Sequence, residues 1–268
     1  MAQSSLARMR RLTCRRVWWI LTACAGLAGG AVLGGPMRPG LIDAKRAPDP
    51  GDALLAEYFR QYLADRDLEA FRVRVDARYS EETLCRLLAD SLGVTTRRAA
   101  VLALGSLGGF ARSNPALGRA LRDSDPMVRR LAEDALWSVW FRADTPDNNR
   151  TLEQVAQLMG RGELRRAEAL ATRLIAVAPR FAEAYNQRAI IYFEQGRFAD
   201  SARDCERVLS LNPYHFGALS GLAQCQLQLD RPAEAIKALR RASELQPYNT
   251  GLRETIRLIE ARVELGES

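Results

Sequence analysis

The side chains that most often do chemistry are few in this sequence of 268 residues. Histidine, the usual general acid–base near neutral pH and a frequent metal ligand, occurs once, as His215. The five cysteines, at positions 14, 24, 85, 205 and 225, include no C-x-x-C pair and do not form a disulfide framework. No P-loop, H-E-x-x-H or G-x-S-x-G motif is present. We therefore expect no metal, no cofactor and no catalytic residue, and predict that the protein is not an enzyme.

The net charge of +7 is confined to one end of the chain. Residues 1–46 hold eight basic side chains and a single acidic one, Asp43, so the remaining residues carry equal numbers of acids and bases. A nucleic-acid-binding surface needs an excess of positive charge to displace counterions from phosphates. This balance argues against nucleic acid as a partner.

The basic N-terminus is followed by a stretch of 19 uncharged residues, 17–35. At 1.5 Å per residue a helix of that length is about 28 Å long, close to the thickness of a bilayer core. Three interpretations remain: an uncleaved signal anchor with a transmembrane helix, a signal peptide cleaved near Ala23-Cys24-Ala25, or a lipoprotein signal. For the last, Leu21-Thr22-Ala23-Cys24 resembles a bacterial lipobox, in which Cys24 would be lipidated.

All three interpretations predict that the rest of the chain lies outside the cytoplasm, in a bacterial envelope, because basic residues stay on the cytoplasmic side. Residues 36–52 contain four prolines and two glycines and are expected to form a flexible linker.

A 34-residue period runs through the C-terminal half of the sequence. Pro179, Pro213 and Pro247 are 34 residues apart, and apolar or small residues keep the same spacing. The positions in register are Val177, Leu211 and Leu245; Ala171, Cys205 and Leu239; Ala167, Ser201 and Ala235; Gly162, Gly196 and Asp230; and Val155, Ala189 and Ala223. Such a unit is predicted to be two antiparallel helices that bury their apolar faces only by stacking on neighbours.

This pattern resembles the tetratricopeptide repeat. The resemblance implies repeats at 148–181, 182–215 and 216–249, closed by a capping helix at 250–264. The sequence departs from the family pattern at Thr151 and Gln226, where a large ring is usual, at Asp230 in place of glycine, and at Ser201 in place of alanine.

A shorter repeat is found between residues 53 and 143. The segment from Asp123 through Arg129 to Leu136 closely resembles a HEAT repeat, and Asp90 with Arg97 matches it less closely. The resemblance implies helical hairpins in which loop aspartates and arginines form a structural ladder. Residues 66–79 alternate apolar and charged side chains as a strand would, but a lone strand has no partner, so we expect helix there. Trp137, Trp140 and Phe141 are expected to fill the core where the two repeat regions meet.

The predicted fold is therefore all-α, an α-solenoid of HEAT-like hairpins followed by three tetratricopeptide repeats. In the tetratricopeptide family certain first-helix positions face a concave groove that binds a partner protein or peptide. Carried over by register, these are Glu183, Asn186, Gln187, Ile190, Phe193 and Glu194, then Ser220, Gly221, Gln224, Leu227 and Gln228.

We expect a membrane-tethered scaffold that binds a protein or peptide in this groove. The alternatives are a self-associating structural protein of the envelope and an enzyme-associated subunit similar to HEAT-like bilin lyases. A groove occupied by the chain's own neighbouring segments is also compatible with the sequence. His215, in the loop between two repeats, is predicted to be a turn residue.

Overall fold

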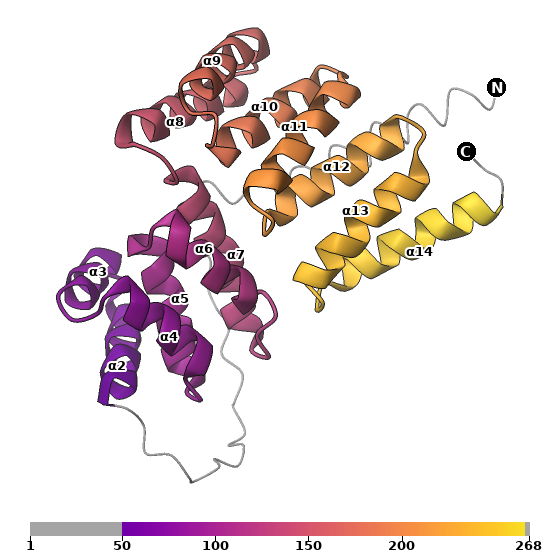
Figure 1. The fold of residues 1–268 in the computed structure, drawn as a ribbon. Helices are drawn as coiled ribbons and strands as arrows, with labels where there is room; N and C mark the ends of the chain where they lie inside the picture. Colours follow the sequence, from indigo (N-terminus) through magenta and orange to yellow (C-terminus); the bar gives the residue numbers. More distant parts are fainter. Residues whose placement is uncertain (1–49, 266–268) are drawn as a thin grey trace. The chain divides into compact units, whose positions relative to one another are not determined.

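The computed structural model describes residues 50–265, and every regular element in that range is a helix (Figure 1). The predicted signal or anchor at 1–35, Cys24 and the linker up to residue 49 lie outside the described residues. Within residues 50–265, no helix combines the length and the apolar character needed to cross a membrane. The first described helix begins at Pro50, so residues 50–52 of the predicted linker are helical; proline is tolerated in a first helical turn.

Six helices precede the repeats: α2 (Pro50–Asp65), α3 (Leu68–Asp76), α4 (Glu81–Asp90), α5 (Val94–Leu107), α6 (Phe110–Ala120) and α7 (Pro126–Phe141). Side chains fix several of their starts: Ser80 accepts a hydrogen bond from the Thr83 backbone N–H, and Asp125 accepts one from that of Val128. The ambiguous stretch 66–79 contains helix α3, as expected. Its strand-like alternation is overridden because a single strand here would leave backbone groups unpaired.

Seven helices make up the repeats and their cap: α8 (Pro146–Gly160), α9 (Leu164–Val177), α10 (Ala182–Glu194), α11 (Phe198–Leu211), α12 (Phe216–Gln228), α13 (Pro232–Leu245) and α14 (Thr250–Glu264). Pro179, Pro213 and Pro247 lie in the connections between successive pairs, where a residue that cannot continue a helix is tolerated. The described part of the chain is therefore an α-solenoid, as the period predicts.

The turn inside each pair uses the same backbone conformation. Gly162 and Gly196 have φ of +74° and +76°, and Asp230, which replaces the third glycine, has φ of +60°. Only glycine adopts this left-handed region without steric cost, and aspartate tolerates it better than most residues. The departure in sequence therefore leaves the turn geometry unchanged.

Small residues let the two helices of a pair approach closely. Ala167, Ser201 and Ala235 are all buried at this crossing. The Ser201 hydroxyl donates to the backbone oxygen of Ala189 at 2.7 Å, so the departure from alanine adds a hydrogen bond between α10 and α11.

The charged ladder of the HEAT-like segment is present between its stacked hairpins. Arg97 forms two hydrogen bonds with the Asp123 carboxylate, at 2.8 and 3.1 Å, and Arg98 forms two with Asp125. Arg129 donates to the backbone oxygens of Asp123 and Ser124. These charges have the structural role that was predicted for them: Arg97 and Arg98 join α5 to the loop before α7, and Arg129 holds that loop to the start of α7.

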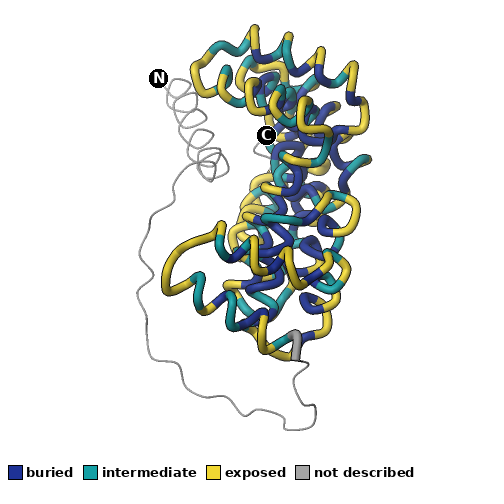
Figure 2. Tube along the Cα trace, turned by 90° about the vertical axis from the view of Figure 1, so that its left-hand side faces the viewer, coloured by how far each residue is buried: buried dark blue, intermediate teal, exposed yellow. Residues whose placement is uncertain are grey.

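The two halves share one apolar core. Buried side chains of α2–α7 form a continuous cluster that includes Phe216 at the start of α12, and Leu245 of α13 packs on its edge. Buried and exposed stretches alternate along the helices of both halves (Figure 2). The described residues 50–265 accordingly belong to one compact unit.

Candidate functional site

The predicted groove residues lie on α10 and α12, and we call them the inner face. The structure divides this face into a buried end, at the start of the two helices, and an open end near their last turns. The chain itself covers the buried end, through a hydrogen-bond network and helix α7.

Glu183 is the centre of a buried hydrogen-bond network at the start of α10. Its Oε1 accepts from the side-chain amides of Asn186 and Gln187, both at 2.8 Å. Its Oε2 lies 3.0 Å from Nε2 of His215, in front of α12. The Glu183 side chain is 1% exposed, so these three donors replace the water that a carboxylate would otherwise bind. Glu183, Asn186 and Gln187 therefore do not line an open groove.

His215 has a defined tautomer because its two ring nitrogens have different partners. The backbone N–H of Ala218 donates to Nδ1 at 3.0 Å, which requires a lone pair there. The ring proton is then on Nε2 and is donated to Glu183. The prediction of a simple turn residue was incomplete: His215 caps α12 and is fully buried. The sequence signal for this capping role was the position of His215 directly before a predicted helix.

Helix α7 covers this network. Trp140 stacks on His215 with ring centroids 4.0 Å apart, and its indole Nε1 donates to Asn114 at 2.7 Å. Trp137 meets the His215 ring edge-on. A side chain at Gly217 would come within 2.8 Å of the Trp137 ring, so glycine is required for this contact. Both tryptophans are core residues at the junction, as predicted.

The loops between repeats also contact the HEAT-like segment. Asn114 on α6 donates to Asn212 in the loop before α12, at 3.0 Å. Gln246, 34 residues further on, donates to Glu133 on α7 at 2.6 Å. Burial raises the pKa of Glu133, while the Gln246 hydrogen bond and nearby arginines oppose that rise. Equivalent loop positions thus supply the polar contacts between the two halves.

The open end of the inner face holds the remaining predicted residues. Leu227 is 39% exposed, and Glu194 and Gln228 are also exposed. Ile190, Ser220 and Gln224 are half-buried beside them, whereas Phe193 and Gly221 are buried, Phe193 against Phe198. Apolar side chains next to carboxamides suit a bound peptide, since amides can bond its backbone while Ile190 and Leu227 contact its side chains.

The two cysteines of the repeats are buried packing residues. Cys205 and Cys225 are buried between α11 and α12, and the Cys225 thiol donates to Ser201 at 3.2 Å. The hydrogen bond with Cys225 and burial both raise the pKa of Cys205, which disfavours its thiolate. Both were predicted to be buried small residues, and both are. Within residues 50–265 no group of three potential metal ligands comes together.

Comparison with known proteins identifies the repeats. Two tetratricopeptide repeat models match the chain, one over residues 152–216 and the other over residues 192–249. A TPR repeat-containing protein of Rhizobium etli is 34% identical over 85 residues, 32% of this chain and 42% of that protein. The WD and tetratricopeptide repeats protein 1 of mouse and of human is 40% identical over 65 residues, 23% of this chain and 10% of each protein. Residues 152–249 of this chain are therefore tetratricopeptide repeats.

This chain spans less than half the length of those curated relatives. Among solved structures, the Sgt2 TPR domain from Aspergillus fumigatus matches with a TM-score of 0.42 at 21% identity, covering 46% of this chain and 82% of that one. The TPR2AB domain of yeast Sti1 in complex with pHSP90 matches with a TM-score of 0.38 at 14% identity, covering 79% and 96%. Both TM-scores lie below 0.5, so the fold assignment depends on the helices of this chain and on the family models.

Proposed function

We propose that this protein is a scaffold that binds a segment of a partner protein along the open end of its inner face. The observation that carries the proposal is the pairing of half-exposed apolar side chains with side-chain amides on α10 and α12 of a tetratricopeptide array. The bound segment would be extended or helical, with apolar side chains against Ile190 and Leu227 and its backbone bonded by Gln224 and Gln228.

The covered end supports a short binding site. Glu183, Asn186 and Gln187 are engaged inside the chain, so a partner meets only the last turns of α10 and α12. No basic clamp for a terminal carboxylate is present among the inner-face residues, since Glu194 supplies the only charge at the open end. We therefore propose an internal, largely apolar segment of the partner as the ligand, and no catalysis by the scaffold itself.

Site-specific crosslinking in living cells tests this proposal. A photoreactive amino acid at Leu227 should form a discrete adduct with a partner protein. The same amino acid at Val177, which is 71% exposed on α9, is the matched control and should not form that adduct. Ile190→Asp should abolish the Leu227 adduct while circular dichroism remains unchanged. An adduct that survives Ile190→Asp, or one that forms equally from Val177, would contradict the binding site.

The same measurement separates a partner from self-association. An adduct with twice the mass of the chain, containing only peptides of this protein, would support the structural, self-associating alternative instead.

We also propose that the repeats act outside the cytoplasm, tethered through the N-terminal segment. The support is the cluster of five arginines before the uncharged stretch 17–35. A reporter active only outside the cytoplasm, fused after residue 268, should be active, and a cytoplasmic reporter at the same point should not. The reverse result would overturn the orientation. Labelling with a radioactive fatty acid, lost in Cys24→Ser, would select the lipoprotein interpretation over the other two.

A further inference from the structure

The repeats have a second kind of surface, the grooves between successive second helices. One of these grooves lies between α9 and α11 over α10, and we call it the filled groove. The next lies between α11 and α13 over α12, and we call it the hollow groove. The two are related by the 34-residue period, so each side chain of one has a counterpart in the other.

In the filled groove, aromatic and charged side chains of α10 occupy the space. Arg188 forms two hydrogen bonds with Asp204 of α11, at 2.7 and 2.9 Å. Its guanidinium lies 5.8 Å from the ring centroid of Tyr185 and 5.5 Å from that of Tyr192. Arg207 of α11 lies 5.7 Å from the Tyr185 ring. The groove is thus closed by tyrosine rings held between guanidinium groups.

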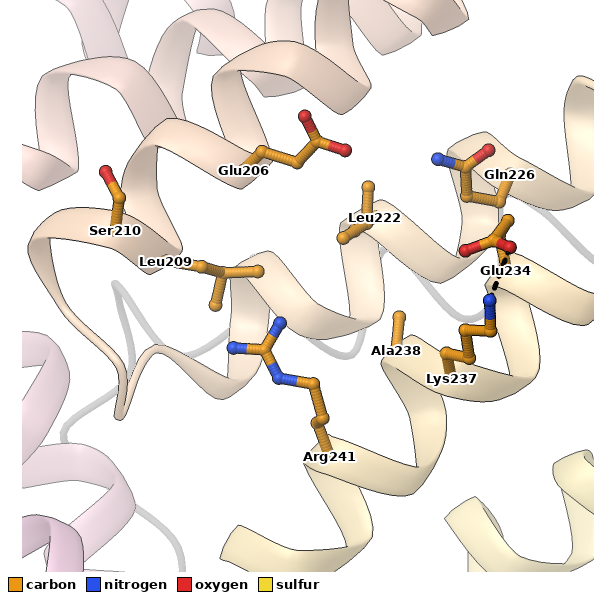
Figure 3. A pocket seen from close by; sticks show the side chains of 9 residues that line it. All are labelled: Glu206, Leu209, Ser210, Leu222, Gln226, Glu234, Lys237, Ala238 and Arg241. Atoms are coloured by element: carbon orange, nitrogen blue, oxygen red, sulfur yellow. Dashed lines mark hydrogen bonds and ion pairs between the residues drawn. The ribbon is translucent and has the colours of Figure 1, made fainter.

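In the hollow groove the same positions carry smaller and less polar residues. Leu219, Leu222 and Gln226 stand where the filled groove has Tyr185, Arg188 and Tyr192, and Ala238 stands where it has Asp204. A cavity of about 480 Å³ results, lined by residues of α11, α12 and α13 (Figure 3). Ligand-binding cavities typically measure about 300–1,000 Å³. Leu222 and Ala238 are almost fully buried and form an apolar floor.

Two polar side chains of the hollow groove lack the partners that their positions have in the filled groove. Gln226 is 8% exposed, and its Oε1 is buried without a hydrogen bond to any residue in the described range. Arg241, the counterpart of Arg207, is exposed on the rim of the groove and has no ring beneath it, because Leu219 replaces Tyr185. Lys237, in contrast, is paired with Glu234 at 2.7 Å (Figure 3). A buried carbonyl oxygen without a donor favours a ligand that brings one.

We propose that the hollow groove binds a tyrosine side chain of a partner protein. The ring rests on Leu222 and Ala238, beside the guanidinium of Arg241. The side-chain amide of Gln226 turns its buried Oε1 toward the groove, where it accepts a hydrogen bond from the phenol O–H. The filled groove supplies the argument for this occupant, since the chain itself uses tyrosine rings beside arginines to close the equivalent space. The proposal is independent of the inner face, which lies on other residues of α10 and α12.

Titration of the full-length chain with N-acetyltyrosinamide tests the proposal. Methyl NMR signals of Leu209, Leu222 and Ala238, which line the cavity, should shift with ligand concentration, and that of Leu227 on the inner face should not. N-Acetylphenylalaninamide should bind about fivefold more weakly, because it lacks the hydroxyl that Gln226 accepts. N-Acetylleucinamide should produce no saturable shift.

Three variants make the result specific. Leu222→Arg with Ala238→Asp rebuilds the Arg188–Asp204 pair inside the cavity and should abolish binding. Leu227→Arg places an arginine on the other face of the same helix and should bind as the parent does. Gln226→Leu should fold normally and lose only the preference for tyrosine over phenylalanine, which keeps the proposal testable even if the double variant unfolds.

The proposal is overturned by an absence of cavity shifts up to the solubility limit of the ligand, or by equal binding of tyrosine and phenylalanine. Shifts of the same methyl groups that depend on protein concentration alone would assign the groove to a second copy of this chain and would also overturn it. Loss of the inner-face crosslink leaves this proposal unaffected, because Ile190 and Leu227 do not line the cavity.

Discussion

The second and third repeats of this array share one backbone plan and use their side chains in opposite ways. In the second repeat, the polar groups of Glu183 and Arg188 are engaged through four hydrogen bonds with residues of α10 and α11 and one with His215. In the third repeat the counterparts are Gly217, which packs against Trp137 of α7, and Leu222, which lines the hollow groove. The second repeat thus fills its outer groove with its own side chains. The third repeat, whose Phe216 and Leu245 also pack against α2–α7, leaves the corresponding groove hollow.

The strongest test of this contrast is Glu183→Ala. The change leaves His215, Asn186 and Gln187 buried without their acceptor, and we expect a loss of about 3–5 kcal/mol in the free energy of unfolding. Urea denaturation followed by circular dichroism measures it. Ser220→Ala, at the position in the third repeat equivalent to Asn186, should change stability little. Similar losses in the two variants would remove the distinction between the repeats.

The outer grooves provide a second test, Asp204→Ala. Arg188 would then keep its charge in a largely buried position without its two hydrogen bonds, and we expect a loss of about 2–3 kcal/mol. Adding Arg188→Leu reproduces the Leu222 and Ala238 chemistry of the third repeat and should restore part of that stability. If the double variant is less stable than Asp204→Ala alone, the third repeat is not a valid template for the second.

Substitutions in the turns of the two repeats should change the stability by a smaller amount. Gly196 and Asp230 adopt the same left-handed backbone conformation, so Gly196→Ala should lower stability by about 1 kcal/mol, and Asp230→Gly should raise it by up to about 1 kcal/mol. Thermal unfolding of both variants at one pH measures the pair. A stabilising effect of Gly196→Ala would mean that the turn is not constrained as described.

The smallest effect concerns the carboxyl group at the second junction, Glu133. Burial raises the pKa of Glu133 above its ordinary value of 4.5 in the folded protein. As the pH rises through this range, the carboxyl group loses its proton more easily in the unfolded chain than in the folded one, so the free energy of unfolding falls. Glu133→Gln can still accept from Gln246 and carries no charge. The variant should therefore become more stable relative to the parent as pH rises from 4 to 7, and equal to it below about pH 4. A stability difference independent of pH would contradict this account.

The repeats could be predicted from sequence because their signals are local. The prolines, the turn glycines and the small crossing residues act within one helical pair, and their spacing determined both the helices and the register of the inner face. Helix α3 was predicted on a similar local argument, the lack of a strand partner. The strand-like alternation of its side chains was misleading because α3 is covered on one side only, with Phe71 and Val75 buried and Val73 exposed.

The sequence left open a groove covered by the chain itself, but it could not show which end is covered, because the contacts there join residues far apart in the chain. Glu183 at a groove position gives no sign that His215 lies against it, or that Trp140 lies over both. The hollow groove was missed for a different reason: Gln226 was recognised as a departure from the family pattern, but a sequence does not show which neighbours are too small to fill the space. Comparing each repeat with the next at equivalent positions is the signal that would have found it.

The contact of α7 with α12 also has a consequence for how the molecule unfolds. In a simple solenoid each unit contacts only its neighbours, so the repeats can unfold one after another from one end of the array. Here the indole of Trp140 on α7 stacks on the imidazole of His215 before α12, so the helices α8–α11 are enclosed between two elements that contact each other. The described helices should lose their structure in a single cooperative transition, and the curvature of the array is consequently fixed by contacts within the chain.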